Sequence, residues 1–522
     1  REQRPANVQN EREKNLDVKQ ESDSPYEKAK RTNFVRNYLE PVVGPLLLTA
    51  IAFYLRSYHL AENKHVIWDE AHFAKFGAFY NRHEFYHDVH PPLGKMLCGL
   101  SEYLSGFNNS KFMFESGKSY PRDINIKQMR LFQVVFSTLV VPMCYYTCKQ
   151  MQLSLWSTYL ISLNACFEIS FIVLGKFVLL DNFLIFFITA SFMCFSRVFN
   201  LRKREGSRLW KVWMLLTGVS IGCACSVKWV GLFVTAVIGL YVILDLWIKF
   251  WDTQNFTWKK YSRCWAYRII YLIIVPIMMY LLFFKIHYAL LYKPGTGSGS
   301  MSTLFQVNLR QTDIGDQPRL VKLDNTVTIR SQGPSPNLLH SHPQLYPDGS
   351  NQHQVTTYGY KDTNNVWTFR PAREDWSYTD YLKDGDVIRL KHTNTAANLH
   401  SHEIHGHVSP EFYEVSGYGD EAIGDEKDDW VFEVMDQIHS SNITYVNANE
   451  QDTEYFDYIH PVSTSFRLRH KYLGCYLATT GKAYPAWGFK QGEVICKPAA
   501  PKDSFRARFD KSTWWNIESV EK

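Results

Sequence analysis

The feature that most constrains the fold is a nearly continuous apolar run, LISLNACFEISFIVLGKFVLLDNFLIFFITASFMCF, at residues 160–195. This run is too long and too continuous for the buried strands of a soluble α/β protein, which is the alternative. A helix needs about 20 apolar residues to cross a bilayer. A window of that length gives seven candidate spans, at residues 41–60, 131–148, 155–173, 177–196, 212–227, 229–248 and 269–291. We therefore expect a polytopic α-helical membrane region over residues 41–292.

Basic residues predict how these spans are oriented. The connections at residues 197–211 and 249–268 are rich in lysine and arginine, which favour the cytoplasmic side. The charged tail at residues 1–40 falls on the same side if the spans alternate, and its composition predicts disorder. Because no cleavable signal pattern is present, we expect the first span to act as a signal anchor. The loop at residues 61–130 and everything after Tyr292 are then expected on the luminal or extracellular face.

The second half of the sequence contains an internal repeat. A glycine- and serine-rich linker at residues 293–302 is expected to be flexible and leads into it. Segments that begin at Val327, Val387 and Phe466 share a strand-like start, a polar turn and then LHSH, LHSH or YLAT. Each of the three units closes on a tryptophan. Three such units can share one core around a pseudo-threefold axis, so we predict a β-trefoil over residues 303–522, with a β-sandwich as the alternative.

The repeated LHSH motif raises the question of a metal site. It supplies four histidines: His340, His342, His400 and His402. No cysteine or carboxylate recurs with them at ligand spacing, so we favour contacts with turns or sugars over zinc. Cys475 and Cys496 are the two cysteines of this polar half, and they could form a disulfide or remain two free buried thiols.

The loop VIWDEAHFAKFGAFYNRHEFYHDVHPPLGKML, at residues 66–97, concentrates polar side chains beside the first span. Asp69 and Glu70 follow an apolar VIW, where the dielectric falls and a carboxylate can act as a base. A solvated acidic pair at a helix start is the alternative. Between His90 and Lys95 a Pro-Pro turn opens a segment with apolar residues at helical spacing. That segment is predicted to lie flat on the bilayer, either as a plain anchor or as part of a site.

Charged residues at the ends of the apolar spans add cations to the same face. Arg130 opens the second span, Lys176 and Asp181 interrupt the third and fourth, and Lys228 separates the fifth from the sixth. Such residues are costly in lipid and mark polar sites or pathways, although one at a helix end can also snorkel. By alternation the basic residues fall on the luminal side, with Asp69. The pattern predicts an anionic lipid headgroup held near a base.

Taken together, these motifs resemble the protein O-mannosyltransferases. The resemblance rests on the loop quoted above, on MRLFQVVFSTLVVP, FVLLDNFL and SVKWVGLF, and on the three-repeat domain, which resembles a MIR domain. The wording HEFYHDVHPPLGKML is closer to the second subfamily than to the first or fourth. Members of the family continue past the MIR domain with further membrane spans, whereas this sequence stops at Lys522. We expect either a truncated sequence or the absence of those spans.

The resemblance implies a C-type glycosyltransferase-like fold in the endoplasmic reticulum membrane, with the MIR domain luminal. It implies transfer of mannose from dolichyl phosphate mannose to serine or threonine hydroxyls of secretory proteins. It also implies a heterodimer with a first-subfamily partner and no nucleic acid. A non-catalytic, sugar-binding membrane anchor or chaperone-like subunit is the competing function, and a lipid scramblase or transporter is a third.

The resemblance also implies roles for individual residues. Asp69 is expected to be the base, and Glu70 to orient the acceptor or the base. The candidates for binding the donor phosphate are Arg130 and Lys228, with His90 and Lys95 as weaker ones. The leaving group is already a stable anion, so the reaction needs neither a general acid nor a metal cofactor; a divalent ion held by the two carboxylates is the alternative. We expect the four histidines of the repeat to form a glycan- or acceptor-binding surface that does no chemistry.

Overall fold

The computed structural model describes residues 39–522 apart from residues 108–111, 123, 313, 315, 335, 373–380, 421, 438–443, 447–457 and 522. The predicted disordered tail, residues 1–40, lies outside the described residues except for its last two. The chain divides into two compact units. One comprises the residues up to His83 together with Asp88–Leu291, and the other comprises Glu84–His87 together with Tyr292–Lys522.

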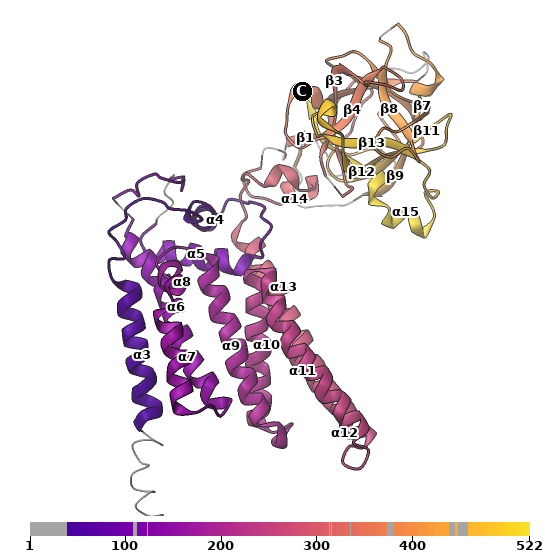
Figure 1. Ribbon diagram of the computed structural model, residues 1–522. Helices are drawn as coiled ribbons and strands as arrows, with labels where there is room; N and C mark the ends of the chain where they lie inside the picture. Colours follow the sequence, from indigo (N-terminus) through magenta and orange to yellow (C-terminus); the bar gives the residue numbers. More distant parts are fainter. Residues whose placement is uncertain are drawn as a thin grey trace, which may run out of the picture. The chain divides into compact units, whose positions relative to one another are not determined.

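The first unit, the membrane unit, is built from helices (Figure 1). They are α3 (Glu40–Ser57), α4 (Glu70–Arg82), α5 (Pro92–Leu104), α6 (Ile126–Gln150), α7 (Leu155–Phe167), α8 (Ile169–Leu174), α9 (Leu180–Asn200), α10 (Arg208–Val227), α11 (Leu232–Trp251), α12 (Trp258–Ile269) and α13 (Val275–Leu290). Within the described residues, five helical segments are long and apolar enough to cross a membrane. They are α6, α9, α10, Trp229–Trp251 and Trp258–Leu290. The prediction of a polytopic α-helical membrane region is therefore confirmed.

The other two predicted spans correspond to shorter helices. The span at 41–60 falls on α3, which has 18 residues. The span at 155–173 falls on α7 and α8, which are separated at Glu168. Glu168 leaves the helical backbone conformation, and its Oε1 accepts a hydrogen bond from Ser170 N at 3.3 Å. A carboxylate that caps a new helix thus interrupts the apolar run that hydropathy alone joins into one span.

Two short helices of the membrane unit, α4 and α5, lie at one end of the long helices, with α5 crosswise to them (Figure 1). The predicted helix after the Pro-Pro turn is confirmed as α5, which begins at Pro92. Gly77 and Gly99 allow α4 and α5 to approach closely, because a Cβ on Gly99 would lie 3.1 Å from the carbonyl oxygen of Gly77. The loop and the helix ends around them share one apolar core, which includes Phe73, Leu93 and Val178.

A chain of buried polar side chains holds the non-helical turn before α9. Asn182 donates to Gln133 Oε1 at 3.1 Å and to the carbonyl oxygens of Leu174 and Phe177 at 3.0 and 3.2 Å. Backbone groups inside a membrane need a partner within the protein. The amide of Asn182 supplies one where the helix stops.

The second unit, the trefoil unit, contains three successive sets of four strands. They are β2 (Thr326–Ser331), β3 (Leu338–Leu345), β4 (His353–Tyr358) and β5 (Val366–Pro371); β6 (Val387–His392), β7 (Asn398–His405), β8 (Tyr413–Tyr418) and β9 (Trp430–Gln437); and β11 (Thr464–His470), β12 (Tyr476–Ala483), β13 (Gly492–Lys497) and β14 (Trp515–Glu521). The first and fourth strands pair antiparallel within each set and with the next set around the ring. The middle strands form three hairpins that pair with one another. This threefold pairing confirms the predicted β-trefoil and excludes the sandwich.

The repeated tryptophans explain why three weakly similar sequences give one symmetric core. Trp367, Trp430 and Trp515 are fully buried. Each indole donates a hydrogen bond to the carbonyl of the leucine in its own lobe's motif, at 3.0, 2.9 and 2.9 Å. A buried indole N–H needs such a partner. In the third lobe Cys475 and Cys496 form a disulfide, which settles the choice that the sequence left open.

The glycine- and serine-rich segment at residues 293–302 is ordered where the sequence predicts a flexible linker. Phe85 N donates to the carbonyl of Lys293 at 2.9 Å, and Gly297 N donates to the carbonyl of Phe85 at 3.2 Å. A Cβ on Gly295 would lie 2.3 Å from the Phe85 carbonyl oxygen. These glycines therefore allow backbone to lie against backbone, a role that composition alone does not distinguish from flexibility.

Candidate active site

The Asp-Glu motif divides into two residues with different surroundings. Glu70, the first residue of α4, is fully buried. Its carboxylate accepts hydrogen bonds from Arg130 Nε at 3.0 Å and Nη2 at 2.8 Å, from Val178 N at 3.1 Å and from Tyr120 Oη at 3.2 Å. The carboxylate therefore ties the start of α4 to the start of α6 and to the turn before α9. Glu70 has little capacity left to contact a substrate.

Arg130 is equally committed. Its guanidinium is 1% exposed, and its remaining N–H groups donate to the carbonyls of Leu60, Asn63 and His65 at 3.3, 2.7 and 3.3 Å. A guanidinium has five N–H donors, and the loop and Glu70 accept from all of them. The sequence predicts that Arg130 binds a lipid phosphate. In this structure, however, all five N–H groups of its guanidinium already donate to the loop and to Glu70. What Arg130 visibly does is fix residues 60–70.

Asp69 has the opposite character. It occupies the N-cap position of α4, yet its side chain makes no capping hydrogen bond. The carboxylate is partly exposed and has no hydrogen-bond or ion-pair partner among the described residues. An aspartate at this position normally caps its helix. The alternative, a solvated acidic pair at a helix start, does not describe the buried Glu70, and the partly exposed carboxylate of Asp69 is left available for another group.

Trp68 precedes Asp69 in an unusual backbone conformation. Its φ is +51°, in the left-handed region, and its side chain is 60% exposed. For a bulky L-residue this conformation costs roughly 1–2 kcal/mol. Sequence reasoning passed over this residue, and no local pattern marks a left-handed tryptophan.

Lys228 and His90 meet on the side of α4 that Phe73 occupies. Lys228 caps the end of α10, and its Nζ lies 2.9 and 3.1 Å from the two carboxylate oxygens of Asp181 and 5.6 Å from the centre of the Phe73 ring. The His90 ring lies 6.3 Å from the same ring. Phe73 N donates to the Asp69 carbonyl, so this cluster begins one helical turn from Asp69. Lys228 and Asp181 are both partly exposed.

Lys95 is occupied in a different way. It is 2% exposed, and its Nζ donates to Asp88 Oδ2 at 2.7 Å and to the His90 carbonyl at 2.6 Å. Burial would raise the pKa of Asp88, but the ammonium of Lys95 outweighs it, so the pKa of Asp88 is lowered. Burial lowers the pKa of His90, and the charges of Lys228 and Lys95 add to that effect. The sequence did not point to Asp88 as the partner of Lys95.

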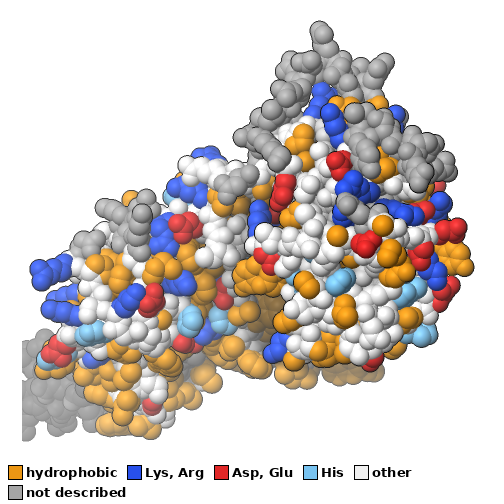
Figure 2. All heavy atoms as spheres, turned by 90° about the horizontal axis from the view of Figure 1, so that it is seen from above, with side chains coloured by type: hydrophobic (Ala, Val, Ile, Leu, Met, Phe, Trp, Pro, Cys, Tyr) orange, Lys and Arg blue, Asp and Glu red, His pale blue; other side chains and the backbone are white. Residues whose placement is uncertain are grey.

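Figure 2 looks onto the end of the helices that carries α4 and α5. Basic, acidic and histidine side chains gather over that end of the membrane unit among hydrophobic ones. Of the six residues predicted for the reaction, Glu70 and Arg130 are locked together, and Lys95 is buried against Asp88 and the His90 carbonyl. Asp69, Lys228 and His90 are partly exposed, so a substrate can reach them.

The four histidines of the trefoil lie at equivalent places in its first two lobes. His340 Nδ1 lies 2.8 Å from Asn365 Oδ1, and His400 Nδ1 lies 2.9 Å from Asp428 Oδ1. All but His402 are buried, and His402 is nearly so. The second histidines lack this short contact. His342 packs edge-on against the exposed ring of Phe489, with ring centres 5.2 Å apart.

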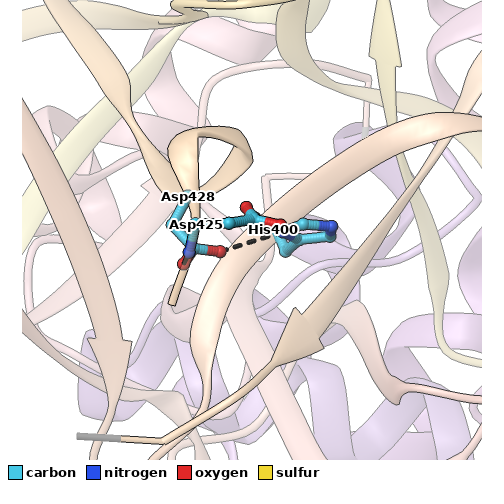
Figure 3. A group of neighbouring side chains, drawn as sticks. All are labelled: His400, Asp425 and Asp428. Carbon is cyan, nitrogen blue, oxygen red and sulfur yellow. Dashed lines mark hydrogen bonds and ion pairs between the residues drawn. The ribbon is translucent and has the colours of Figure 1, made fainter. Parts of the chain in front are cut away.

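His400, Asp425 and Asp428 form a group whose ligand atoms are close enough to hold a metal ion (Figure 3). The equivalent position in the first lobe shows that this geometry does not require a metal ion. There an uncharged amide, Asn365, stands in the place of Asp428 at nearly the same distance from its histidine. An amide is a poor metal ligand, yet the first lobe keeps the same contact between its histidine and Asn365. The contact is therefore explained by a hydrogen bond between side chains and does not need a metal ion. We therefore assign the group to the support of the lobe.

A carboxylate missed by the sequence analysis lies beside the second histidine of the second lobe. Glu414 accepts from His407 Nε2 at 2.9 Å and from Ser350, and His402 Nε2 lies 3.5 Å away. Burial alone would raise the pKa of Glu414, but these donors lower it to about 2. Its equivalent in the third lobe, Glu493, accepts from Ser409 and Thr480. Glu414 and Glu493 are each the second residue of equivalent strands, β8 and β13.

A cavity of about 410 Å³ lies elsewhere in the trefoil unit, between residues 294–314 and the first lobe. Arg330, Tyr360 and Lys361 line it. None of the residues predicted from the sequence does.

The comparisons with known proteins agree with this division into two units. A family model described as dolichyl-phosphate-mannose-protein mannosyltransferase matches residues 46–292, and a MIR domain model matches residues 337–506. Mannosyltransferase 6 of Saccharomyces cerevisiae is 51% identical over 490 residues, 92% of this chain and 63% of the relative. Mannosyltransferase 2 of Candida albicans is 48% identical over 95% of this chain and 63% of the relative.

More distant relatives and a solved structure extend the match. Protein O-mannosyl-transferase 2 of Drosophila melanogaster is 35% identical over 90% of this chain and 59% of the relative. One chain of the solved S. cerevisiae protein O-mannosyltransferase Pmt1-Pmt2 complex bound to the sugar donor is 31% identical, with a TM-score of 0.73 over 93% of this chain and 64% of that chain. The chain spans less than two thirds of the length of these relatives.

Proposed function

The chain belongs to the dolichyl-phosphate-mannose-protein mannosyltransferase family, in its second subfamily, and carries a MIR domain. From this premise we propose that it transfers mannose from dolichyl phosphate mannose to serine and threonine hydroxyls of secretory proteins. The observation that carries the proposal is the unengaged carboxylate of Asp69, held beside a fully engaged Glu70. A membrane anchor has no need of a carboxylate kept out of its own helix cap.

The reaction is a single displacement in which Asp69 is the base. The acceptor hydroxyl oxygen attacks C1 of mannose and forms the new glycosidic bond. The bond between C1 and the phosphate oxygen breaks, and dolichyl phosphate leaves with the electron pair. The hydroxyl proton goes to Asp69. Attack opposite to the leaving group converts a β donor into an α product.

On the donor side the geometry favours Lys228 as the phosphate-binding cation, with His90 beside it. The ammonium of Lys228 is partly exposed, and Asp181 already holds it at the end of α10. A cation fixed before the substrate arrives stabilises developing negative charge without reorganisation. Arg130 and Lys95 do not contact the substrate in this scheme. Arg130 positions the Asp69 segment through Glu70, and Lys95 positions His90.

The scheme uses no metal. The charge on the phosphate is met by the ammonium of Lys228, and Glu70, one of the two carboxylates that a divalent ion would need, is already bound by Arg130. We propose that the trefoil contributes a weak glycan- or acceptor-binding surface. His342 and His402 contribute to this surface, and His340 and His400, held by Asn365 and Asp428, support it.

We further propose an endoplasmic reticulum location with the trefoil unit luminal, and a heterodimer with a first-subfamily member. Support comes from the basic connections that follow α9 and α11, and from the solved relative, which is a complex of two different chains.

The test is mannose transfer to a Ser/Thr peptide by the protein with its partner in membranes. Lys228→Met should raise the KM for the donor about tenfold or more, the effect of losing one charged contact. Lys211→Met, in the first turn of α10, serves as a matched control and should leave that KM unchanged. A wild-type complex that binds donor but transfers nothing would favour the alternative, a non-catalytic sugar-binding subunit.

A further inference from the structure

The strained residue beside the proposed base has no structural task of its own. None of the described aromatic rings contacts the Trp68 indole, and its Nε1 makes no hydrogen bond to a described residue. Its one hydrogen bond to a described residue is in the backbone, from Ala71 N to its carbonyl oxygen at 3.2 Å. A large apolar side chain that is 60% exposed, on a backbone that disfavours it, gains nothing from the fold.

Both neighbours of Trp68 and Asp69 hold the chain in this conformation. On one side Val66 is buried, and its backbone bonds to Lys118 and Gly117 at 2.9 and 2.8 Å. On the other side Glu70 is fixed by Arg130. Trp68 and Asp69, two of the three residues between these anchors, are exposed and partly exposed, respectively. Strain that the surroundings enforce in this way is typical of binding and catalytic sites.

Other exposed tryptophans of the membrane unit provide a comparison. Trp156 and Trp258 are 88% and 77% exposed, and they lie in the first turns of α7 and α12. Neither has a positive φ. Such positions are typical of aromatic residues that anchor helices at a membrane interface. An anchor needs no particular backbone conformation, so the left-handed bend at Trp68 calls for a more specific occupant.

We infer that the indole of Trp68 is the acceptor-binding wall of the site and packs against the residue next to the target serine or threonine. The inference rests on the proposed function. The donor-side groups Lys228 and His90 meet around Phe73, one turn further along α4, whereas Trp68 precedes the helix and adjoins the base. The partner chemistry is an extended polypeptide segment with an apolar side chain beside its hydroxyl. An aromatic face recognises such a segment with little loss of conformational entropy.

The test measures the KM for both substrates in Trp68→Ala, Trp68→Phe and Trp68→Gly. Trp68→Ala should raise the KM for the acceptor peptide about tenfold and leave the KM for the donor unchanged. Trp68→Phe, which keeps a ring, should retain most of the affinity. Trp68→Gly removes the strain together with the ring, and it should be as impaired as Trp68→Ala. Wild type should prefer a peptide with proline or valine beside the serine over one with glycine, and Trp68→Ala should lose that preference.

Trp156→Ala is the control, and it should change neither KM. Recovery of activity in Trp68→Gly would show that the strain, and not the indole, matters, and would overturn the inference. Equal effects of Trp68→Ala and Trp156→Ala, dependent on lipid composition, would place Trp68 in the membrane interface instead. An unchanged acceptor preference in Trp68→Ala would also overturn it. If wild type transfers no mannose, the proposed function fails, and this outcome is distinct from all of these.

Discussion

In the loop at residues 66–95 two adjacent carboxylates have opposite surroundings, whereas in the trefoil two histidines from different lobes have nearly the same one. Glu70 is locked by Arg130, and Asp69 one residue earlier is unengaged. His340 and His400, far apart in sequence, each bond a side-chain oxygen from the turn before the lobe's tryptophan. A repeat preserves what every lobe needs in order to fold. A motif that occurs once can combine a support with a reactive group.

The largest expected effect is the loss of turnover when Asp69, the unengaged carboxylate of this pair, is replaced. Asp69→Asn keeps the shape of the side chain but removes the base, so the turnover rate should fall by about 10²–10⁴. Because the Asp69 carboxylate forms no hydrogen bond or ion pair with a described side chain, the folded fraction and the donor KM should stay at wild-type values. The measurement is single-turnover transfer from saturating donor. Wild-type turnover would show that Asp69 is not the base.

Breaking the locked pair should act on folding first. Glu70→Gln leaves Arg130 buried with an unpaired charge, a change that costs about 3–5 kcal/mol of stability. The readout is the thermal unfolding midpoint of the purified protein in detergent, with Glu84→Gln as a control that leaves this ion pair intact. A stable Glu70→Gln protein with no activity would instead give Glu70 a direct role with substrate.

In the trefoil, removing His400 should cost more stability than removing His340, because the partner of His400 is charged and the partner of His340 is neutral. His400→Ala leaves Asp428 buried without its side-chain donor, at a cost of about 1–3 kcal/mol. His340→Ala leaves the neutral Asn365, which still donates to the Tyr360 carbonyl, and should cost less. Hydrogen exchange of strands β3 and β7 in the intact protein would measure both. A selective loss of transfer to glycoprotein acceptors, with unchanged exchange, would make these histidines part of the binding surface.

The smallest expected effect is the loss of trefoil stability in mild acid. Burial lowers the pKa of His392 from 6.5 to about 4. Between those values the unfolded chain binds a proton that the folded chain does not, so stability falls as the pH drops through this window. One such group gives about 1 kcal/mol for a change from pH 6 to pH 5. His392→Gln should flatten the pH dependence of trefoil unfolding there, and an unaltered slope would contradict the assignment.

The sequence was sufficient wherever a pattern is periodic or repeated. Apolar runs predicted the membrane unit, and three similar segments that end in tryptophan predicted the trefoil. Local patterns failed where a distant residue decides. Nothing near Glu70 indicates that Arg130, sixty positions later, will occupy it. Nothing near Gly295 indicates that Phe85 will lie against it. The hydropathy average over residues 155–173 predicted one span, because it could not detect that the single residue Glu168 ends one helix and caps the next.

The backbone bridge between Glu84 and Lys293 has a consequence for the order of assembly during synthesis. The ribosome makes the loop segment about two hundred residues before it makes the strand partner that fixes it. Contacts so distant in sequence close late, because their loop entropy must be overcome first. The segment between α4 and His90 therefore stays without this partner until the last helix of the membrane unit has been made. Biogenesis thus contains a built-in delay, and the nascent chain completes this part of its loop only after that helix has emerged.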